Sequence, residues 1–454
     1  MMSNNYRISK YQQCTKQKLN IEIYNNFVIK SLSVACLGLI TGFLTYLFFN
    51  YTNFVENLFW NNSYIEHGNI RNIFIPALGG LLVGLILHFF APKSTRGHGV
   101  AAVVNAVTFK DGKISPKVTI AKTITSGIAI GSGSSVGAEG PMVQLGATVG
   151  SLIGYKFFKH SSAAKTLIAC GAAASVSAAF NAPLAGIFFA LEIILNKFSY
   201  HNFIFVTIAS LSASAVRFNL LGDIPTYGSQ VYGLKTPEEL ILYLILGFIT
   251  GGFAALFVKV FYSTGDFFSK LPKIPSFMKP AIGGLLIGII GYFIPEVLGT
   301  GHHTILEALE GNLSLIPFIT LAFLKIFATS FAIGSGGSGG VFAPVLFVGA
   351  MVGGAFGIIV NSIFPHLSSP VGAYALVGMA ALFAGTDHAP LTAIILLIEL
   401  VNNYKMVLPL MLTCVVSVSF AKYLYPEDLT SGFFTRLGLN LEKARLNQIE
   451  KDNK

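Results

Sequence analysis

The sequence predicts an all-α polytopic membrane protein made of two similar halves. Of its 454 residues, 53% are apolar and only 11% are Asp, Glu, Lys or Arg, whereas a soluble domain carries about 25% charged residues. The mean hydropathy is +0.67, and three sequence blocks recur at an offset of 203 to 207 residues. These observations exclude an ordinary water-soluble enzyme, a disordered chain and a collagen-like chain.

The elements follow in order along the chain. Residues 1–26 are polar and basic, and we expect them to form a cytoplasmic segment. Apolar runs then fill 27–222 as the first membrane repeat and 238–438 as the second, joined by a polar linker at 223–237. Several runs are shorter than the roughly 20 residues that span a bilayer, which predicts broken or tilted helices.

Residues 439–454 form a short tail that is also rich in cations. Both termini are then expected in the cytoplasm under the positive-inside rule. The formal charge of +10 is concentrated at the ends and in short loops, so we assign it to contact with anionic lipid and expect no nucleic acid partner.

The internal duplication rests on blocks that keep one register. Nine residues after the proline of the third block stands a carboxylate, Glu192 in the first half and Glu399 in the second. Duplicated membrane halves with broken helices are typical of transporters and channels, which bind substrate near the midplane. The blocks are PALGGLLVG at 76–84 with PAIGGLLIG at 280–288, residues 131–150 with 334–353 at ten identities in twenty, and APL at 182–184 with 389–391.

Two glycine-rich turns predict an anion site. GAEGP at 137–141 and GVFAP at 340–344 each lead into an apolar segment through a proline, which is tolerated in the first turn of a helix. Each turn therefore predicts a helix N-terminus, whose free N–H groups and partial positive charge suit an anion. Residues 326–386 contain no Asp, Glu, Lys or Arg, so no full cation would hold the anion too tightly there. The alternative is that the glycines only allow close helix packing.

Glu139 is the only Asp, Glu, Lys or Arg between residues 123 and 155. A carboxylate in an apolar membrane segment is costly, which makes it a functional candidate. At the N–H groups that would hold an anion, its charged form would compete with that anion, and its protonated form should leave the site open. The alternative is a surface glutamate that caps a helix end.

GSGSSVGAEGP, LKIFATSFAIGSGGSGGVFAP and AAFNAPLAGIFFALE resemble the signature segments of CLC chloride channels and proton/chloride antiporters. The likeness covers about residues 27–438, and the short tail resembles the prokaryotic members without cytosolic CBS domains. It implies a homodimer in which each subunit has its own anion pathway, built from two inverted repeats of tilted and re-entrant helices. It also implies that Glu139 is the external gate and that the backbone near Gly140, Val341 and Phe342 lines the anion sites.

Two anion-lining positions depart from the family pattern. The first motif, usually Gly-Ser-Gly, reads GHGVA at 97–101, so His98 replaces the serine and is followed by the candidate lining residues Gly99 and Val100. An imidazole N–H can donate to an anion and would make its affinity pH-dependent; the alternative is a histidine in the aqueous vestibule. Near the C-terminus, Thr430 or Ser431 stands where the family commonly has a tyrosine.

The proton pathway departs as well. The antiporters have two successive glutamates after the Asn-Ala-Pro motif, and this chain has Glu192 followed by Ile193. An aliphatic side chain cannot relay a proton, and the channel branch also carries one there. Glu192 itself is either a substitute relay or a structural carboxylate at a helix end.

The remaining polar residues in apolar text are interpreted as structural. Lys325 is expected to snorkel toward an interface or to pair locally. In the internal repeat, Asp387 and His388 correspond to Phe180 and Asn181 of the first half. We interpret them as satisfying a helix end.

The resulting prediction is a passive voltage- or pH-gated chloride channel, a homodimer in membrane lipid, that passes chloride and similar monovalent anions through a path gated by Glu139. A proton-coupled chloride antiporter is the close alternative. An intramembrane enzyme is the remaining one, but the sequence has no metal-binding or nucleophile motif. We therefore expect no catalytic residue, metal or cofactor, chloride being the transported ion, and a location in the cell inner membrane.

Overall fold

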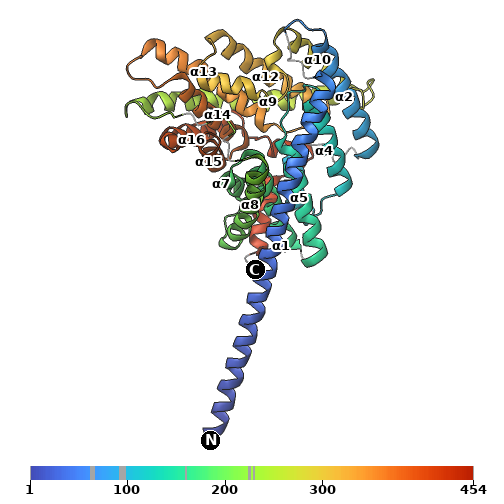
Figure 1. The fold of residues 1–454 in the computed structure, drawn as a ribbon, viewed down its shortest axis with the longest axis vertical. Coiled ribbons are helices and arrows are strands. Elements are labelled where there is room, and N and C mark those ends of the chain that lie inside the picture. The colour runs from blue at the N-terminus through green and yellow to red at the C-terminus, as the bar shows by residue number, and fades with distance from the viewer. Residues whose placement is uncertain are drawn as a thin grey trace.

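The computed structural model describes residues 2–61, 67–91, 99–158, 161–222, 226–228 and 231–452, with side chains described from residue 27 to residue 446 inside these ranges, apart from 157, 158, 161 and 162. Helices account for nearly all of these residues (Figure 1). The first half contains α1 (Met2–Trp60), α2 (Arg71–Phe90), α3 (Gly99–Phe109), α4 (Pro116–Gly131), α5 (Glu139–Ile153), α6 (Ser161–Phe180), α7 (Pro183–Phe189) and α8 (Tyr200–Leu221).

The second half repeats this series. It contains α9 (Glu239–Ser269), α10 (Lys279–Phe293), α11 (His302–Glu310), α12 (Leu315–Gly334), α13 (Phe342–Ile363), α14 (Val371–Asp387), α15 (Pro390–Val401) and α16 (Val407–Leu424), and the chain ends with α17 (Ser431–Arg436) and α18 (Leu441–Asp452). Short π-helices, η2 (Gly154–Phe158) and η3 (Ala190–Leu195), continue α5 and α7, and 3-10 turns occur at Pro295–Val297 and Tyr404–Met406.

Eight helices among the described residues are long and apolar enough to cross a membrane. Shorter apolar helices, such as α3, α7 and α15, lie between them. The apolar runs 166–195 and 371–400 are each broken at an Ala-Pro pair, because the proline begins a new helix at its first position. The prediction of an all-α polytopic membrane protein with broken helices is confirmed.

The two halves face each other through α2 and α10 in a reciprocal contact. A β-carbon at Gly80 would lie 2.1 Å from the carbonyl oxygen of Pro280, and one at Gly284 would lie 2.1 Å from that of Pro76. Only glycine permits so close an approach of two helix backbones. These four residues belong to the duplicated PALGGLLVG block, so equivalent positions meet as expected for inverted repeats.

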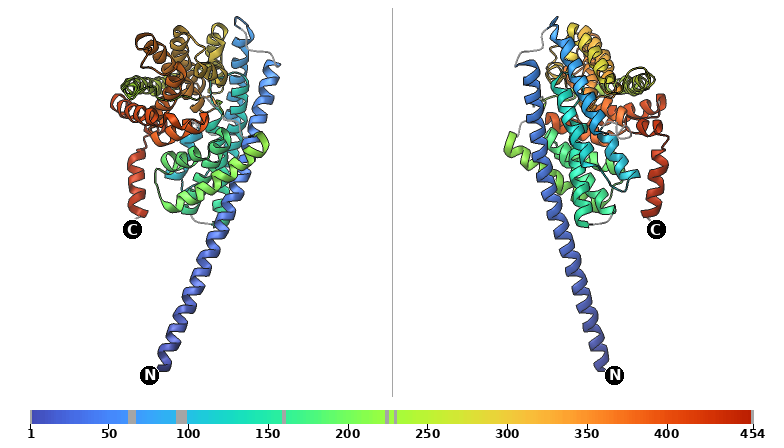
Figure 2. Two further views of the ribbon diagram at one scale, coloured as in Figure 1. Left: turned by 60° about the vertical axis from the view of Figure 1, so that its left-hand side comes forward. Right: turned by 90° about the vertical axis from the view of Figure 1, so that its right-hand side faces the viewer.

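Both ends of the chain leave the molecule at the same end (Figure 2). The polar residues 2–26 continue α1 as helix beyond the helical body, where the sequence analysis expected only a cytoplasmic segment. The C-terminal α18 points in the same direction.

Candidate functional site

The two glycine-rich turns meet each other. The N–H of Gly137 donates to the carbonyl oxygen of Gly340 at 2.8 Å, and the N–H of Gly340 donates to that of Gly137 at 2.7 Å. In the described part of the chain this antiparallel bridge is the only β pairing. Each turn leads within two residues into a helix, so the bridge holds the N-termini of α5 and α13 side by side. Their partial positive charges therefore act on one region.

A small cavity lies at this meeting point, and three helices begin at its wall. Val100, Gly140 and Phe342 each stand in the first turn of a helix, α3, α5 and α13 respectively. The N–H groups of a first turn have no partner inside the helix, so the wall is rich in donors that suit an anion. The lining residues are Val100, Gly140, Gly340, Val341, Phe342, Asp387 and Leu429.

The cavity thus brings together Val100, Gly140, Val341 and Phe342, four of the residues that the sequence suggested for anion binding. Gly99 lies directly behind this wall. A β-carbon there would lie 2.0 Å from the carbonyl oxygen of Gly140, so the close approach of α3 to α5 requires glycine. His98 lies outside the described residues.

Glu139 reaches back to the bridge and is only 6% exposed. A β-carbon at Gly137 would lie 2.1 Å from its Oε2 atom, and one at Gly340 would lie 3.1 Å from it. The carboxylate accepts from the backbone N–H of Ala343, in the first turn of α13, and from its own, while Oε2 has no hydrogen-bond partner. The carboxylate therefore holds a donor that an anion at this N-terminus would use.

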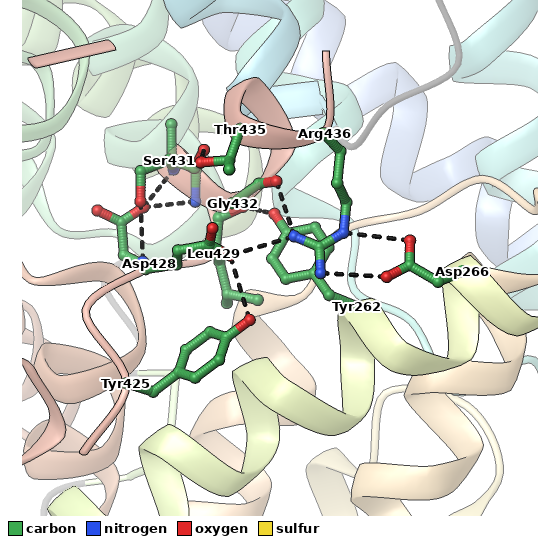
Figure 3. A network of polar contacts seen from close by, with 11 residues as sticks. Tyr262, Asp266, Tyr425, Asp428, Leu429, Ser431, Gly432, Thr435 and Arg436 are labelled. Carbon is green, nitrogen blue, oxygen red and sulfur yellow. Dashed lines mark hydrogen bonds and ion pairs between the residues drawn. The ribbon is translucent and has the colours of Figure 1, made fainter. Parts of the chain in front are cut away.

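The segment before α17 closes the cavity from the C-terminal side. The N–H of Leu429 donates to the carbonyl oxygen of Thr386 at 3.0 Å, which ties this segment to the end of α14. The same segment is held by Tyr262, whose hydroxyl donates to the Leu429 carbonyl at 2.5 Å (Figure 3). The Arg436 guanidinium lies 4.0 Å from the centre of the Tyr262 ring and pairs with Asp266 at 3.3 Å.

Thr430 and Ser431 differ in what their hydroxyls contact. Ser431 accepts from the N–H of Asp428 at 2.9 Å, and the Asp428 carboxylate accepts from the N–H groups of both residues. Thr430 is 5% exposed and its Oγ1 has no hydrogen-bond partner. Of the two candidates for the family's tyrosine position, Thr430 has the hydroxyl available for a ligand.

Glu192 and Glu399 each cap a helix of the opposite half. Glu192 accepts from two backbone N–H groups at the start of α15, at 3.2 and 2.7 Å, and from the Thr392 hydroxyl at 2.6 Å. Glu399 accepts from two N–H groups at the start of α7, at 2.9 and 2.7 Å. This geometry corresponds to the structural alternative considered for Glu192.

Ile193, next to Glu192 in the chain, is buried with its side chain in the hydrophobic core. Its carbonyl oxygen accepts from the Arg445 guanidinium of α18 at 3.0 Å. The backbone at Ile193 is thus tied to the C-terminal helix α18.

Lys325 pairs locally and does not snorkel to an interface. It is fully buried in α12, and its ammonium donates to the carbonyl oxygens of Val297 and Gly299 at 2.9 and 2.8 Å. The ammonium also lies 4.6 Å from the centre of the Phe347 ring. Lys122, 203 residues earlier and in the matching helix α4, is likewise buried.

Two residues at the cavity were missed by the sequence analysis. Asp387, which was interpreted as satisfying a helix end, lines the cavity together with Leu429. A signal for Asp387 was present, because it is the only Asp, Glu, Lys or Arg between Lys325 and Glu399. Within the described ranges, no three His, Cys, Asp or Glu side chains form a group that could hold a metal ion.

Comparison with known proteins agrees over most of the chain. Residues 79–422 match the family model described as voltage gated chloride channel. A putative chloride channel protein ClcB-like from Ralstonia nicotianae is 32% identical over 348 residues, which cover 76% of this chain and 80% of that protein. The H(+)/Cl(−) exchange transporter ClcA of Citrobacter koseri is 32% identical over 440 residues, covering 93% and 91%.

A solved structure also shares the fold. The crystal structure of a slow cyanobacterial Cl−/H+ antiporter superposes with a TM-score of 0.80 at 26% sequence identity, covering 92% of this chain and 98% of that one. The arrangement of helices around the cavity is therefore that of a known class of membrane proteins.

Proposed function

This chain belongs to the voltage-gated chloride channel family of anion transport proteins, and on that premise we propose that it exchanges chloride or a similar monovalent anion for protons, with Glu139 as the gate. The names of the ClcA relatives and of the cyanobacterial antiporter support exchange over passive conduction. They outweigh the sequence expectation of a channel, which rested on the single position Ile193.

The observation that carries the proposal is the place of the Glu139 carboxylate. It accepts from an N–H in the first turn of α13, beside the Gly137–Gly340 bridge. An anion and an ionised carboxylate repel each other and compete for the same donors. A neutral carboxylic acid has no such attraction to the helix N-terminus, so protonation releases the donors to the anion. Entry of an anion is thereby linked to uptake of a proton by Glu139.

The anion-lining role falls to the first turns of α3, α5 and α13. Backbone donors at Gly99, Val100, Gly140, Val341 and Phe342 would share the negative charge without a full cation, which favours rapid release. Thr430 follows the lining residue Leu429, and its hydroxyl, which has no hydrogen-bond partner, would be a further donor. We add His98 to these anion-lining residues because it directly precedes Gly99 in the sequence.

A passive chloride channel is the second candidate. Ile193 has no titratable atom, Glu192 is occupied in capping α15, and one relative is named a putative chloride channel protein. In that case Glu139 would open the path on protonation without carrying protons through it.

The assembly and location follow from the same family likeness. We place the protein in membrane lipid as a homodimer, in the cell inner membrane, with both termini in the cytoplasm. The departure of both termini at one end of the molecule supports a common side for them. Neither cofactor nor catalytic residue is needed, since chloride is cargo.

Chloride efflux from liposomes that contain the purified protein tests the proposal. External chloride and pH are recorded together while a potassium ionophore clamps the voltage. We expect protons to move against chloride in a fixed ratio. In Glu139→Gln, an uncharged mimic of the protonated gate, we expect chloride efflux to continue while proton movement falls by about tenfold or more, because a relay without an ionisable group cannot turn over.

The matched control is Glu310→Gln, which makes the same chemical change at an exposed residue and should behave as the wild type. Chloride efflux from the wild type without any proton movement would favour the channel. Intact proton coupling in Glu139→Gln would remove Glu139 from the gate.

A further inference from the structure

A second carboxyl group lies against the anion cavity. Asp387 is the last residue of α14 and lines the cavity together with Gly340 and Phe342. Its carboxylate accepts from the Thr386 hydroxyl at 3.0 Å. An ionised carboxylate at this wall would repel a bound anion, whereas the neutral acid would not. The protonation of Asp387 is therefore linked to occupancy of the cavity, as we propose for Glu139.

His388 follows Asp387 and has a left-handed backbone conformation. Its φ is 52°, in the left-handed region, where non-glycine residues are uncommon and Asn, Asp and His are the most enriched of them. The matching residue of the first half is Asn181, with φ 55°. Both repeats thus place a polar residue in the left-handed conformation directly before the Ala-Pro pair that begins the next half-helix.

The imidazole of His388 is placed between the cavity and the surface. Its side chain is 9% exposed, and its Nδ1 lies 3.6 Å from Oδ2 of Asp428, whose side chain is 19% exposed. The Nε2 atom is buried and has no hydrogen-bond partner. A buried polar nitrogen without a protein partner is explained when water or an exchanging proton reaches it.

Other charged or titratable groups act on these three residues or on Tyr262. They come from α9, α16, α17, α18 and the segment before α17, and both signs are represented. Tyr262 interacts with Asp387 and Asp428, Lys422 with His388, and Arg445 with Asp428, while Glu427 and Arg436 act on Tyr262. Lys422 is exposed on α16, so the charges around His388 and Asp428 extend to the surface of the molecule. No metal-binding group is found there among the described residues.

We propose that Asp387 is the inner proton-exchanging carboxyl of this transporter, and that His388 and Asp428 connect it to the solution at the end from which the C-terminal segment leaves. The inference rests on the proposed exchange of anions for protons. It assigns to Asp387 the inner proton transfer, which the aliphatic side chain of Ile193 cannot perform.

The protons balance in each step. The neutral acid of Asp387 gives its proton, through water in the cavity, to the Glu139 carboxylate, which becomes neutral and leaves the helix N-terminus. Asp387 is then an anion. His388 takes a proton from the solution beside Asp428 at one ring nitrogen, and the imidazolium so formed gives the proton on its other nitrogen to Asp387 through water, which leaves His388 neutral again. Reversal of these steps carries protons the other way.

The test compares Asp387→Asn with the wild type in the same liposome assay, with chloride and protons recorded together. Asparagine keeps the shape and cannot carry a proton, so we expect the proton-to-chloride ratio to fall by about tenfold or more while chloride efflux continues. Asp387→Glu restores a carboxyl and should regain coupling, which a purely structural role at the end of α14 would not predict.

His388→Asn is the second variant, because Asn181 shows that asparagine fits this backbone conformation. We expect it to fold and to slow proton movement several-fold relative to chloride, most strongly when the pH on the tail side is high and protons are scarce. Asp111→Asn, in an exposed turn at φ 48°, is the matched control and should couple as the wild type does.

The outcomes separate the two proposals. Coupled exchange at the wild-type ratio in both Asp387→Asn and His388→Asn overturns the role of Asp387 and leaves the exchange function standing. A wild type that moves chloride without protons overturns the exchange function itself. If Asp387→Asn cannot be purified as a folded protein, His388→Asn decides alone, and unchanged coupling in it counts against the relay.

Discussion

At Gly137 the lack of a side chain leaves room for the Glu139 carboxylate. A β-carbon there would lie 2.1 Å from Oε2 and 3.0 Å from the carboxyl carbon, closer than atoms can approach. Because the Glu139 side chain is flexible, Gly137→Ala should expel the carboxylate from the bridge. We expect chloride efflux several-fold faster than in the wild type and a lower proton-to-chloride ratio, both measured in liposomes.

Gly252→Ala provides the comparison. Its β-carbon would meet only the Phe420 ring, at 3.9 Å, an ordinary contact in the middle of α9. That variant should transport like the wild type. A Gly137→Ala protein with unaltered coupling would mean that the carboxylate site at the bridge does not control the anion path.

Single residues differed in how far the sequence revealed them. Glu139 stood out because no other charge lies near it in the chain, and its place beside the Gly137–Gly340 bridge agrees with the predicted position at a helix N-terminus. Asp387 was equally alone, yet its neighbours in space come from α5, α13 and the segment before α17. Contacts of such long range follow from packing of helices, which local patterns do not encode.

At the scale of elements, the half-helices α7 and α15 depend on carboxylates from the opposite repeat. Glu399 accepts from two N–H groups at the start of α7. Glutamine can satisfy one of them and presents an amide N–H to the other, so Glu399→Gln leaves one of the two donors at the start of α7 without its acceptor. We expect it to lower the free energy of unfolding by about 1–3 kcal/mol, measured by thermal unfolding in detergent.

Glu310→Gln, exposed at the end of α11, should leave the midpoint of thermal unfolding unchanged, since exposed charges contribute little. Equal midpoints for Glu399→Gln and the wild type would show that water replaces the carboxylate at the start of α7.

The sequence predicted the positions of the helices better than the contacts between them. A proline stands at the first or second position of α4, α7, α10 and α15, and the short apolar runs were correctly interpreted as broken helices. The helical continuation of α1 through the polar residues 2–26 was not expected, because hydropathy does not distinguish a polar helix from a polar coil. The pairing of Glu192 with α15 was only one of two alternatives until the helices were placed.

At the scale of the whole molecule, both termini leave at one end. We expect epitope tags at the two ends to share one side of the membrane, and that side to be the cytoplasm. In intact spheroplasts neither tag should react with an external protease, and both should react after permeabilisation. Reaction of one tag only would contradict the common side, and reaction of both without permeabilisation would reverse the orientation.

The duplication was the whole-molecule feature that sequence alone established most firmly. It predicted two halves with matching helices, and the reciprocal contacts of Gly80 and Gly284 follow the same offset. The sequence left open how the halves touch, because an offset in the chain carries no information on the axis that relates them.

The reciprocal caps also impose an order in time. Glu192 caps an N–H group that lies 200 residues further along the chain, and a ribosome that adds about 5–20 residues per second reaches it roughly 10–40 s later. During that interval the new carboxylate has no partner, and the start of α7 has no acceptor until Glu399 is made. The first half is therefore synthesised with the start of α7 uncapped, and this half-helix gains its acceptor only when the second half is made.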